Sequence, residues 1–223
     1  MGERNAGAAF TTLRRLARQP SRDGADSARP VPEQCELCGE PIPPAHRHLV
    51  EVTQRELKCV CQACSILFSR EAASQGKYLL VPDRRLYLAD FQLSDAQWEG
   101  LQIPVGLAFF FHSTSAGKPV AIYPSPVGPT ESLLDLETWG ELAVGNPILR
   151  GMQPDVEALL VNRARGAREH FLVPIDECYR LVGLVRLRWR GLGGGQEIWN
   201  EMACFFDVLR QRSQTITSEG EQS

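Results

Sequence analysis

The organisation of this chain is decided by two short stretches, Cys35-Glu-Leu-Cys38 and Cys59-Val-Cys61-Gln-Ala-Cys64. Two C-x-x-C pairs separated by a short segment are the ligand pattern of a four-thiolate metal site, most often a zinc site. Each pair can form a tight turn that directs both sulfur atoms toward one ion. Gly39 follows the first pair, and glycine suits the positive-φ position that such a turn often needs. The spacing therefore predicts a metal site in the first third of the chain.

Four of these five cysteines repeat the C-x-x-C spacing, which selects Cys35, Cys38, Cys61 and Cys64 as the metal ligands. Cys59 is an alternate ligand. On a β-strand its side chain points to the same side as that of Cys61, because side chains alternate with a period of two. Cys59 can therefore replace Cys61 or lie just behind the site.

Two histidines, His46 and His48, lie between the cysteine pairs and are candidate ligands of a mixed site. Four-sulfur coordination suits zinc, and it also suits a single iron ion. The stretch Cys35-Glu-Leu-Cys38-Gly39 resembles one metal-binding loop of rubredoxins, whereas Cys61-Gln-Ala-Cys64-Ser65 lacks the matching glycine. Zinc is therefore the predicted ion and iron is the alternative.

The overall composition is that of an ordinary globular protein, with 43% hydrophobic and 23% charged residues in a chain of 223. The net charge of −3 provides no general attraction to nucleic acid or to acidic membranes. Arg14-Arg15 is followed by no apolar segment of the kind that export signals carry. We therefore expect no transmembrane segment, a cytoplasmic protein, and reduced thiols that are free to bind metal.

Composition and periodicity divide the chain into four parts. The predicted parts are a disordered tail (1–32), a metal module (33–74), an α+β domain (75–212) and a second disordered tail (213–223). Within the first tail, Phe10–Gln19 is either frayed or a short docking helix that folds on a partner. In the metal module, apolar and polar residues alternate along His48–Thr53, and a turn at Gln54-Arg55 returns the chain through Glu56–Cys61. This pattern predicts a β-hairpin with a metal-binding turn at each open end, which is the plan of a zinc ribbon. Ser65–Ser74 is expected to be helical.

The predicted α+β domain alternates strands and helices and closes with two helices. We expect strands at 78–81, 85–89, 105–113, 119–123, 156–163 and 170–174, and helices at 95–101, 135–144, 176–190 and 196–212. Pro124–Thr130 contains three prolines and one glycine and is predicted to be a rigid loop. The fold class is therefore α+β, a small zinc-ribbon module followed by a mixed domain.

Neither nucleic-acid binding nor catalysis is favoured by the residues. Between Cys35 and Ser74, four basic and five acidic side chains give a net charge of −1, so phosphate neutralisation contributes little. His112-Ser113 could be a nucleophile–base pair, and so could His170 with Cys178, but no third group or nucleophile-elbow motif accompanies either. We therefore predict a protein that is not an enzyme and does not bind nucleic acid.

Several long stretches resemble an uncharacterised family found mainly in actinobacteria. They are Cys35-Glu-Leu-Cys-Gly-Glu-Pro-Ile-Pro43, Ile103-Pro-Val-Gly-Leu-Ala-Phe-Phe-Phe-His-Ser113, Tyr123-Pro-Ser-Pro126, Pro154-Asp-Val-Glu-Ala-Leu-Leu-Val-Asn-Arg163 and Val173-Pro-Ile-Asp-Glu-Cys-Tyr-Arg-Leu-Val182. Members of that family tend to be encoded beside uptake [NiFe]-hydrogenase subunits. The resemblance implies a hydrogenase accessory protein whose partners are hydrogenase subunits or maturation factors. It implies no mechanism and no catalytic residues.

The residues and the resemblance together predict a non-catalytic, metal-binding accessory or interaction protein. Two alternatives of different classes stay open. One is a rubredoxin-like electron-transfer protein with iron at the same cysteines, and the other is a zinc-ribbon protein that binds nucleic acid.

Overall fold

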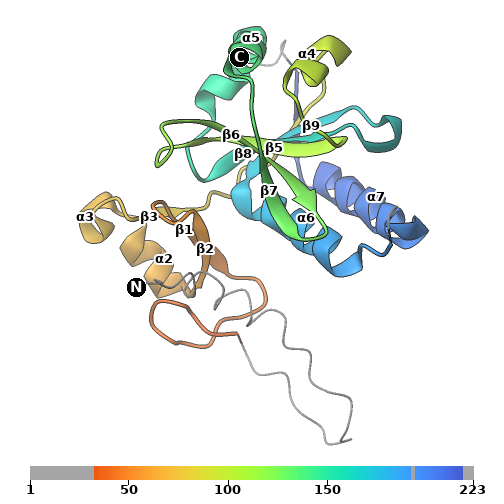
Figure 1. Cartoon of the computed structure of the whole chain (residues 1–223). Coiled ribbons are helices and arrows are strands. Elements are labelled where there is room, and N and C mark those ends of the chain that lie inside the picture. The colour runs from red at the N-terminus through yellow and green to blue at the C-terminus, as the bar shows by residue number, and fades with distance from the viewer. Residues whose placement is uncertain (1–32, 192–193, 218–223) are drawn as a thin grey trace, which may run out of the picture. The chain divides into compact units, whose positions relative to one another are not determined.

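The computed structural model describes residues 33–191 and 194–217. The predicted N-terminal tail with its docking helix at Phe10–Gln19 lies outside the described residues, as does the end of the chain from 218. Within the described residues the strands form two sheets, one of three strands and one of seven. Helices pack on these sheets, so the predicted mixed α+β architecture is confirmed (Figure 1). No helix in the described ranges has both the length and the apolar character needed to cross a membrane.

The small sheet carries the cysteine-rich part of the chain. Its strands, in the order β2-β1-β3, are β1 (Arg47–Glu51), β2 (Glu56–Val60) and β3 (Tyr78–Leu80). Strand β1 pairs antiparallel with both neighbours. Helices α2 (Gln62–Phe68) and α3 (Glu71–Ser74) lie between β2 and β3 in the chain. The sheet thus includes β3, which follows residue 74, the predicted end of the metal module.

The side chains of the small sheet alternate between two apolar clusters, as the pattern along β1 predicts. Leu49 is fully buried beside Val60 and Cys64 in a small cluster that surrounds the cysteines. The next residue, Val50, points the other way and packs in the main core of the large sheet. Leu57 on β2 packs against that same core. One face of the hairpin therefore supports the cysteines, and the other face is attached to the α+β domain.

The large sheet has the strand order β10-β4-β9-β8-β5-β6-β7. Its strands are β4 (Leu86–Leu88), β5 (Leu107–Ser113), β6 (Lys118–Ser125), β7 (Gly128–Ser132), β8 (Glu157–Asn162), β9 (Glu169–Pro174) and β10 (Gln214–Ile216). All neighbouring strands are antiparallel except β10 and β4, which are parallel. Strands β5, β8 and β9 are almost entirely buried, because helices cover both faces of the sheet.

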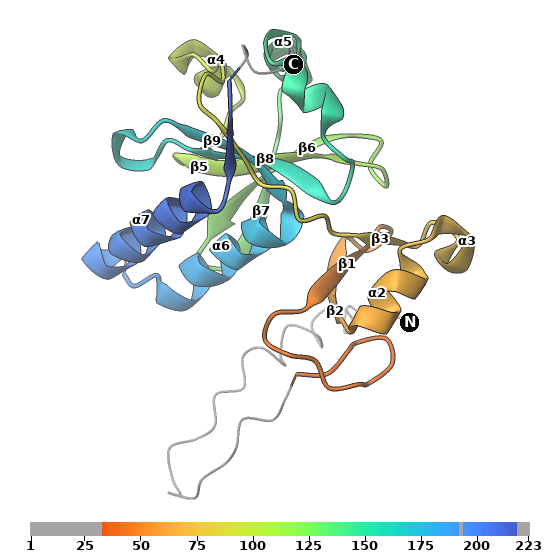
Figure 2. The same ribbon diagram turned by 180° about the vertical axis from the view of Figure 1, so that it is seen from behind.

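Two long helices cover one face of this sheet and two shorter helices cover the other. Helices α6 (Ile175–Arg188) and α7 (Gly195–Gln211) lie on one face, and α4 (Asp95–Gly100) and α5 (Leu136–Gly145) lie on the other (Figures 1 and 2). Short 3₁₀ turns occupy Pro147–Gly151 and Ala164–Gly166. Each face has its own apolar cluster, one with α6 and α7 and the other with α4 and α5.

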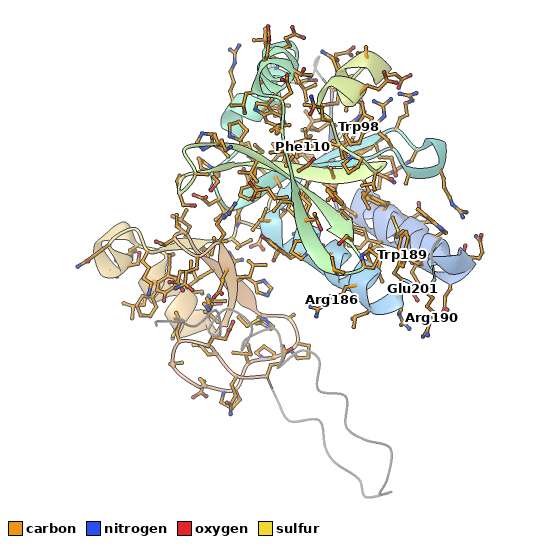
Figure 3. All side chains as sticks on the ribbon, viewed as in Figure 1. Trp98, Phe110, Arg186, Trp189, Arg190 and Glu201 are labelled. Carbon is orange, nitrogen blue, oxygen red and sulfur yellow. The ribbon has the colours of Figure 1, made fainter. Side chains whose placement is uncertain are left out.

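Alternate residues of β5 supply the two clusters. Phe109 packs on the side of α6, where its ring lies 5.8 Å from that of Tyr179. Phe110 packs on the other side, stacked on Trp139 with ring centroids 5.3 Å apart. Figure 3 shows Phe110 beside Trp98 of α4, and Trp189 at the end of α6 near Glu201 of α7. The period-two pattern of the central strands therefore builds both halves of the core.

Most of the predicted strands and helices are present within a few residues, but two segments differ. The predicted loop Pro124–Thr130 is instead a hairpin, in which Ser125 pairs with Gly128 and Pro124 pairs with Pro129. Strand β7 is at the edge of the sheet, and Pro124 lies beyond the part of β6 that pairs with β5. Prolines are tolerated there because the missing N–H groups leave no ladder hydrogen bond unmade.

The second difference concerns the C-terminal segment, which was predicted to be a disordered tail over 213–223. Residues Gln214–Ile216 form β10, which pairs in parallel with β4. Ile216 packs against the core on the side of α4 and α5. The sequence gives no strand signal here, because only one side chain of β10, that of Ile216, is large and apolar.

Candidate metal centre

The first C-x-x-C pair is held in a compact turn by the backbone. The Cys35 N–H donates to the carbonyl of Glu40 at 2.8 Å, and the Gly39 N–H donates to the carbonyl of Cys35 at 2.8 Å. Gly39 has a φ of +80°, a left-handed conformation that glycine adopts without the steric cost that a Cβ brings. The turn that the sequence predicts at Gly39 is present.

The second C-x-x-C pair lies at the start of α2 rather than in a free turn. Cys61 is the N-cap residue of this helix, and its sulfur accepts a hydrogen bond from the Cys64 N–H at 3.4 Å. The Ser65 N–H donates to the Cys61 carbonyl at 2.9 Å. The helix therefore begins at Gln62, before the predicted start at Ser65, and its first turn brings Cys64 back toward Cys61.

Contacts between residues that are far apart in the chain bring the two turns together. The Glu36 N–H donates to the carbonyl of Cys59 at 2.9 Å, and the Cys59 N–H donates to the Glu36 carboxylate at 2.6 Å. Ile42 and Leu49 are buried against Cys35 and Cys64 in the small apolar cluster that surrounds the cysteines. The two hydrogen bonds of Glu36 thus place strand β2 beside the first turn.

The structure brings together the four cysteines that the spacing selects. The sulfur atoms of Cys35, Cys38, Cys61 and Cys64 all lie within 4.8 Å of one another. The Cys38 and Cys61 sulfurs are 3.7 Å apart, and all four thiols are free rather than joined in disulfides. Zinc–sulfur bonds of about 2.3 Å in a tetrahedron require sulfur–sulfur separations of about 3.8 Å. The four-cysteine site therefore has the size of a tetrahedral thiolate metal site.

The electrostatics of the four-cysteine site also suit a cation. Burial raises the pKa of the Cys35 thiol, but backbone hydrogen bonds from Cys61, Cys38 and Leu37 outweigh it and lower that pKa to about 6. Burial and the neighbouring thiols instead raise the pKa of Cys64. One thiolate thus forms readily, while further negative charge is disfavoured by its neighbours. A bound dication offsets this repulsion and allows all four sulfurs to ionise.

The fifth cysteine and the two histidines form a separate group. Cys59, His46 and His48 each present a ligand atom within 4.8 Å of the other two. The rings of His46 and His48 lie edge to face, with centroids 4.8 Å apart. Cys59 packs against the small cluster around Cys35 and Cys64, but its sulfur groups with the histidines that the sequence suggests as ligands of a mixed site.

Asp176 contacts this group of three residues, and no pattern in the sequence predicts that contact. The Nδ1 atom of His48 lies 2.9 Å from the Oδ2 atom of Asp176, which is in the first turn of α6. The hydrogen bond to Asp176 is the main cause of a pKa of His48 raised to about 9, and the Cys59 thiol adds to it. These two residues are 128 positions apart, so only the fold reveals the contact.

The residue pairs considered for catalysis are not arranged as nucleophile and base. His170 is stacked on Phe91, and burial lowers the pKa of its imidazole to about 4. Cys178 is fully buried in α6, and burial raises the pKa of its thiol well above the ordinary value. The Ser113 hydroxyl is hydrogen-bonded to that of Ser115 at 3.1 Å. A thiol in an apolar core is a structural residue rather than a reactive one.

Comparison with known families gives one result. The sequence model of DUF5947, described as a family of unknown function, matches residues 34–213, which is most of the chain. The chain therefore belongs to the DUF5947 family. The matched region includes both cysteine pairs and every described strand except β10, and the family description names no activity and no partner. No curated protein and no solved structure matches the chain.

Proposed function

We propose that this protein is a non-catalytic, metal-binding accessory protein in which one zinc ion holds a zinc-ribbon module at residues 33–74. The observation that carries the proposal is the convergence of four cysteine sulfurs, from two turns that are distant in the chain, within 4.8 Å of one another. Four thiolates complete a tetrahedral shell and leave no position for a substrate. The role of the ion is therefore to stabilise the module.

The size of the module supports a structural role for the metal. Its own apolar cluster contains only five buried residues, namely Cys35, Ile42, Leu49, Val60 and Cys64. A segment of about forty residues buries too little surface to fold alone. Binding of structural zinc provides on the order of 10–16 kcal/mol in small zinc-finger peptides, which is enough to order such a module.

The role in protein interaction rests on the surface and on the resemblance. Large apolar side chains are exposed near the β6–β7 hairpin, where Val127 is 87% exposed and Leu133 is 88% exposed. We take these two side chains as the apolar part of the proposed binding surface, because contiguous exposed apolar patches mark sites that bind other proteins. The stretches that resemble a family encoded beside [NiFe]-hydrogenase genes suggest hydrogenase subunits or maturation factors as partners.

Affinity purification from the native host tests the partner, with metal analysis of the same sample. We expect hydrogenase subunits or maturation proteins to be recovered with the tagged chain, together with zinc. A Cys61→Ser, Cys64→Ser double variant should lose both the zinc and the partner, because the module no longer folds. A Cys204→Ser variant, which changes an exposed cysteine of α7, should retain both. Consistent absence of these proteins would remove the hydrogenase association.

A rubredoxin-like iron site is the alternative, because tetrahedral four-sulfur geometry suits either ion. Cys38 is exposed, so an iron ion here would be accessible for electron transfer at the surface. Protein purified without added metal should be colourless and contain zinc under our proposal. A red protein whose visible absorption bleaches with dithionite would instead establish the electron-transfer alternative.

A further inference from the structure

Three potential metal ligands that the four-cysteine site does not use meet on the other face of the hairpin. His48 on β1 and Cys59 on β2 are direct partners in the antiparallel register, so their side chains lie on the same face of the sheet. That face is the one that carries Val50 and Leu57 toward the main core. His46 precedes β1, and its ring meets that of His48 edge to face.

Hydrogen bonds at Nδ1 fix the orientation of both imidazole rings. The Nδ1 atom of His46 lies 2.9 Å from the carbonyl oxygen of Pro43, and it is also 3.6 Å from the Glu33 carboxylate. The Nδ1 atom of His48 lies 2.9 Å from the carboxylate of Asp176. When each Nδ1–H donates to its oxygen, Nε2 is the atom that faces an ion, and metal binding displaces any proton that Nε2 carries. Metal-binding histidines have this arrangement in most proteins.

One of these Nε2 atoms is buried without a partner. The side chain of His46 is only 8% exposed, and its Nε2 atom makes no hydrogen bond within the described residues. Buried polar atoms in native proteins nearly always have a partner, and an exception often marks an ion or water that binds there. His46 is one of the three residues of this group, together with His48 and Cys59.

We propose that His46, His48 and Cys59 form a second metal site, separate from the four-cysteine site, that binds a divalent transition-metal ion of the zinc class. The ligands are the two Nε2 atoms and the Cys59 thiolate. Asp176 positions His48 and does not itself bind the ion. Two imidazoles and one thiolate leave a fourth coordination position for water or an external ligand.

The dimensions of this group fit such an ion. Three atoms at most 4.8 Å apart surround a point that is at most about 2.8 Å from each of them. Zinc–nitrogen bonds of about 2.0–2.1 Å and zinc–sulfur bonds of about 2.3 Å are only slightly shorter. Small side-chain rotations therefore close the site around an ion. Borderline-soft ligands of this kind select zinc and similar ions over magnesium or calcium.

The same groups could be interpreted as a nucleophile, base and carboxylate in the order Cys59, His48 and Asp176. Two observations favour the metal site. A catalytic triad gives no role to the unpartnered nitrogen of His46, whereas a metal site uses it. Neither the cavity beside Leu57 nor the one beside Trp199 includes Cys59 in its lining, so neither brings a substrate to the thiol.

An ion at this position links the two parts of the fold. His48 and Cys59 belong to the small sheet, whereas Asp176 belongs to the first turn of α6 in the α+β domain. Binding at the second site therefore stabilises the orientation of the hairpin on α6. Because the site retains one open position, a ligand group from outside the chain can reach the ion.

Metal counting on the full chain tests the proposal. The protein is reconstituted anaerobically with Zn²⁺, weakly bound metal is removed by gel filtration, and the zinc per chain is measured. We expect two ions in the wild-type chain and one in His46→Gln and in Cys59→Ser. The controls His112→Gln, on β5, and Cys204→Ser, on α7, should retain two. Circular dichroism of each variant shows whether it is folded.

Replacing the positioning residue provides a second readout. Asp176→Asn should retain both ions at saturating zinc but bind the second one roughly 10–100-fold more weakly, as changes around metal ligands usually do. Titration with Co²⁺ should give d–d absorption of a mixed nitrogen–sulfur site that is absent from His46→Gln. A wild-type chain with a single ion would overturn the proposal. So would loss of an ion in Cys59→Ser but not in His46→Gln, since Cys59 would then be a ligand of the four-cysteine site.

Discussion

The sulfur atoms of Cys38 and Cys61 lie 3.7 Å apart, although 23 positions separate them in the chain. That distance is far too long for a disulfide and matches the edge of a tetrahedron around a zinc ion. The Glu36 N–H donates to the Cys59 carbonyl and so places the first turn beside β2. The proposed role of this protein as a metal-binding accessory factor depends on this geometry.

Removing the metal should loosen the module and leave the large sheet intact. We expect the amides of β1 and β2 to exchange with solvent markedly faster after chelation, because the small cluster around Leu49 is too small to hold them alone. The amides of β8 and β9 should stay protected by the two clusters of the large sheet. Hydrogen–deuterium exchange with mass spectrometry measures both, and equal protection of β1 before and after chelation would contradict a structural role.

Truncating Phe110 should strongly destabilise the α+β domain. Its side chain is fully buried between the sheet and α5, where it stacks on Trp139, and Trp98 contacts it edge to face (Figure 3). Phe110→Ala should lower the free energy of unfolding by about 3–5 kcal/mol, the usual cost of an aromatic cavity in a core. Val127→Ala, at an exposed position, should change it by less than about 0.5 kcal/mol. Urea denaturation measures both values, and similar stabilities would contradict this packing.

Removing Arg84 from its ion pair with Glu157 should destabilise the protein, because the buried carboxylate then has no counter-charge. The carboxylate of Glu157 is completely buried and accepts hydrogen bonds from two guanidinium nitrogens at 2.8 and 2.6 Å. Arg84→Met should destabilise the domain by about 3 kcal/mol, because it leaves a buried charge without its partner. The double variant Arg84→Met, Glu157→Met should be less destabilised than Arg84→Met, as thermal unfolding can show. A double variant that is equally or more unstable would count against this explanation.

Acid should destabilise the fold in part through His170. Burial and the charges of Arg163 and Arg168 lower the pKa of this imidazole from 6.5 to about 4. The folded protein therefore binds fewer protons at this site than the unfolded chain between those two pH values. The stabilising contribution of the neutral ring is complete above pH 6.5 and is lost as the pH falls toward 4, to a total on the order of 3 kcal/mol.

His170→Phe isolates this effect, because it retains an aromatic ring to stack on Phe91 and cannot take up a proton. The stability of the wild-type protein, measured by urea denaturation across this pH range, should fall more steeply than that of the variant. The variant His112→Gln, at an exposed position of β5, should follow the wild type. Parallel curves for the wild type and His170→Phe would show that the ring titrates normally in the folded protein.

Local sequence signals were sufficient for much of the fold. The C-x-x-C spacing selects the four cysteines that converge, because each pair is joined by a short turn whose geometry depends on few residues. Short apolar runs identify β5 and β8, since both strands are buried almost throughout. The apolar stripe of α6 identifies that helix, since one side of it is buried. Ser94 and Asp135 mark the starts of α4 and α5, where their side chains accept the expected capping bonds.

The features that the sequence did not reveal depend on tertiary contacts. Asp176 reaches His48 only because α6 packs beside the hairpin, and no local pattern connects them. Strand β10 is short and polar, and its pairing with β4 orders it. The proline-rich β6–β7 hairpin was predicted to be a loop, because its place at the edge of the sheet is not visible in the chain itself. Composition alone cannot detect any of these three features.

The most direct measurement is X-ray absorption spectroscopy at the zinc edge of the Cys59→Ser variant, in which only the four-cysteine site should remain loaded. The account predicts one zinc ion per chain with a single shell of four sulfur ligands at about 2.3 Å. A variant that retains no zinc, or a spectrum that requires nitrogen or oxygen ligands in place of sulfur, would contradict the central claim.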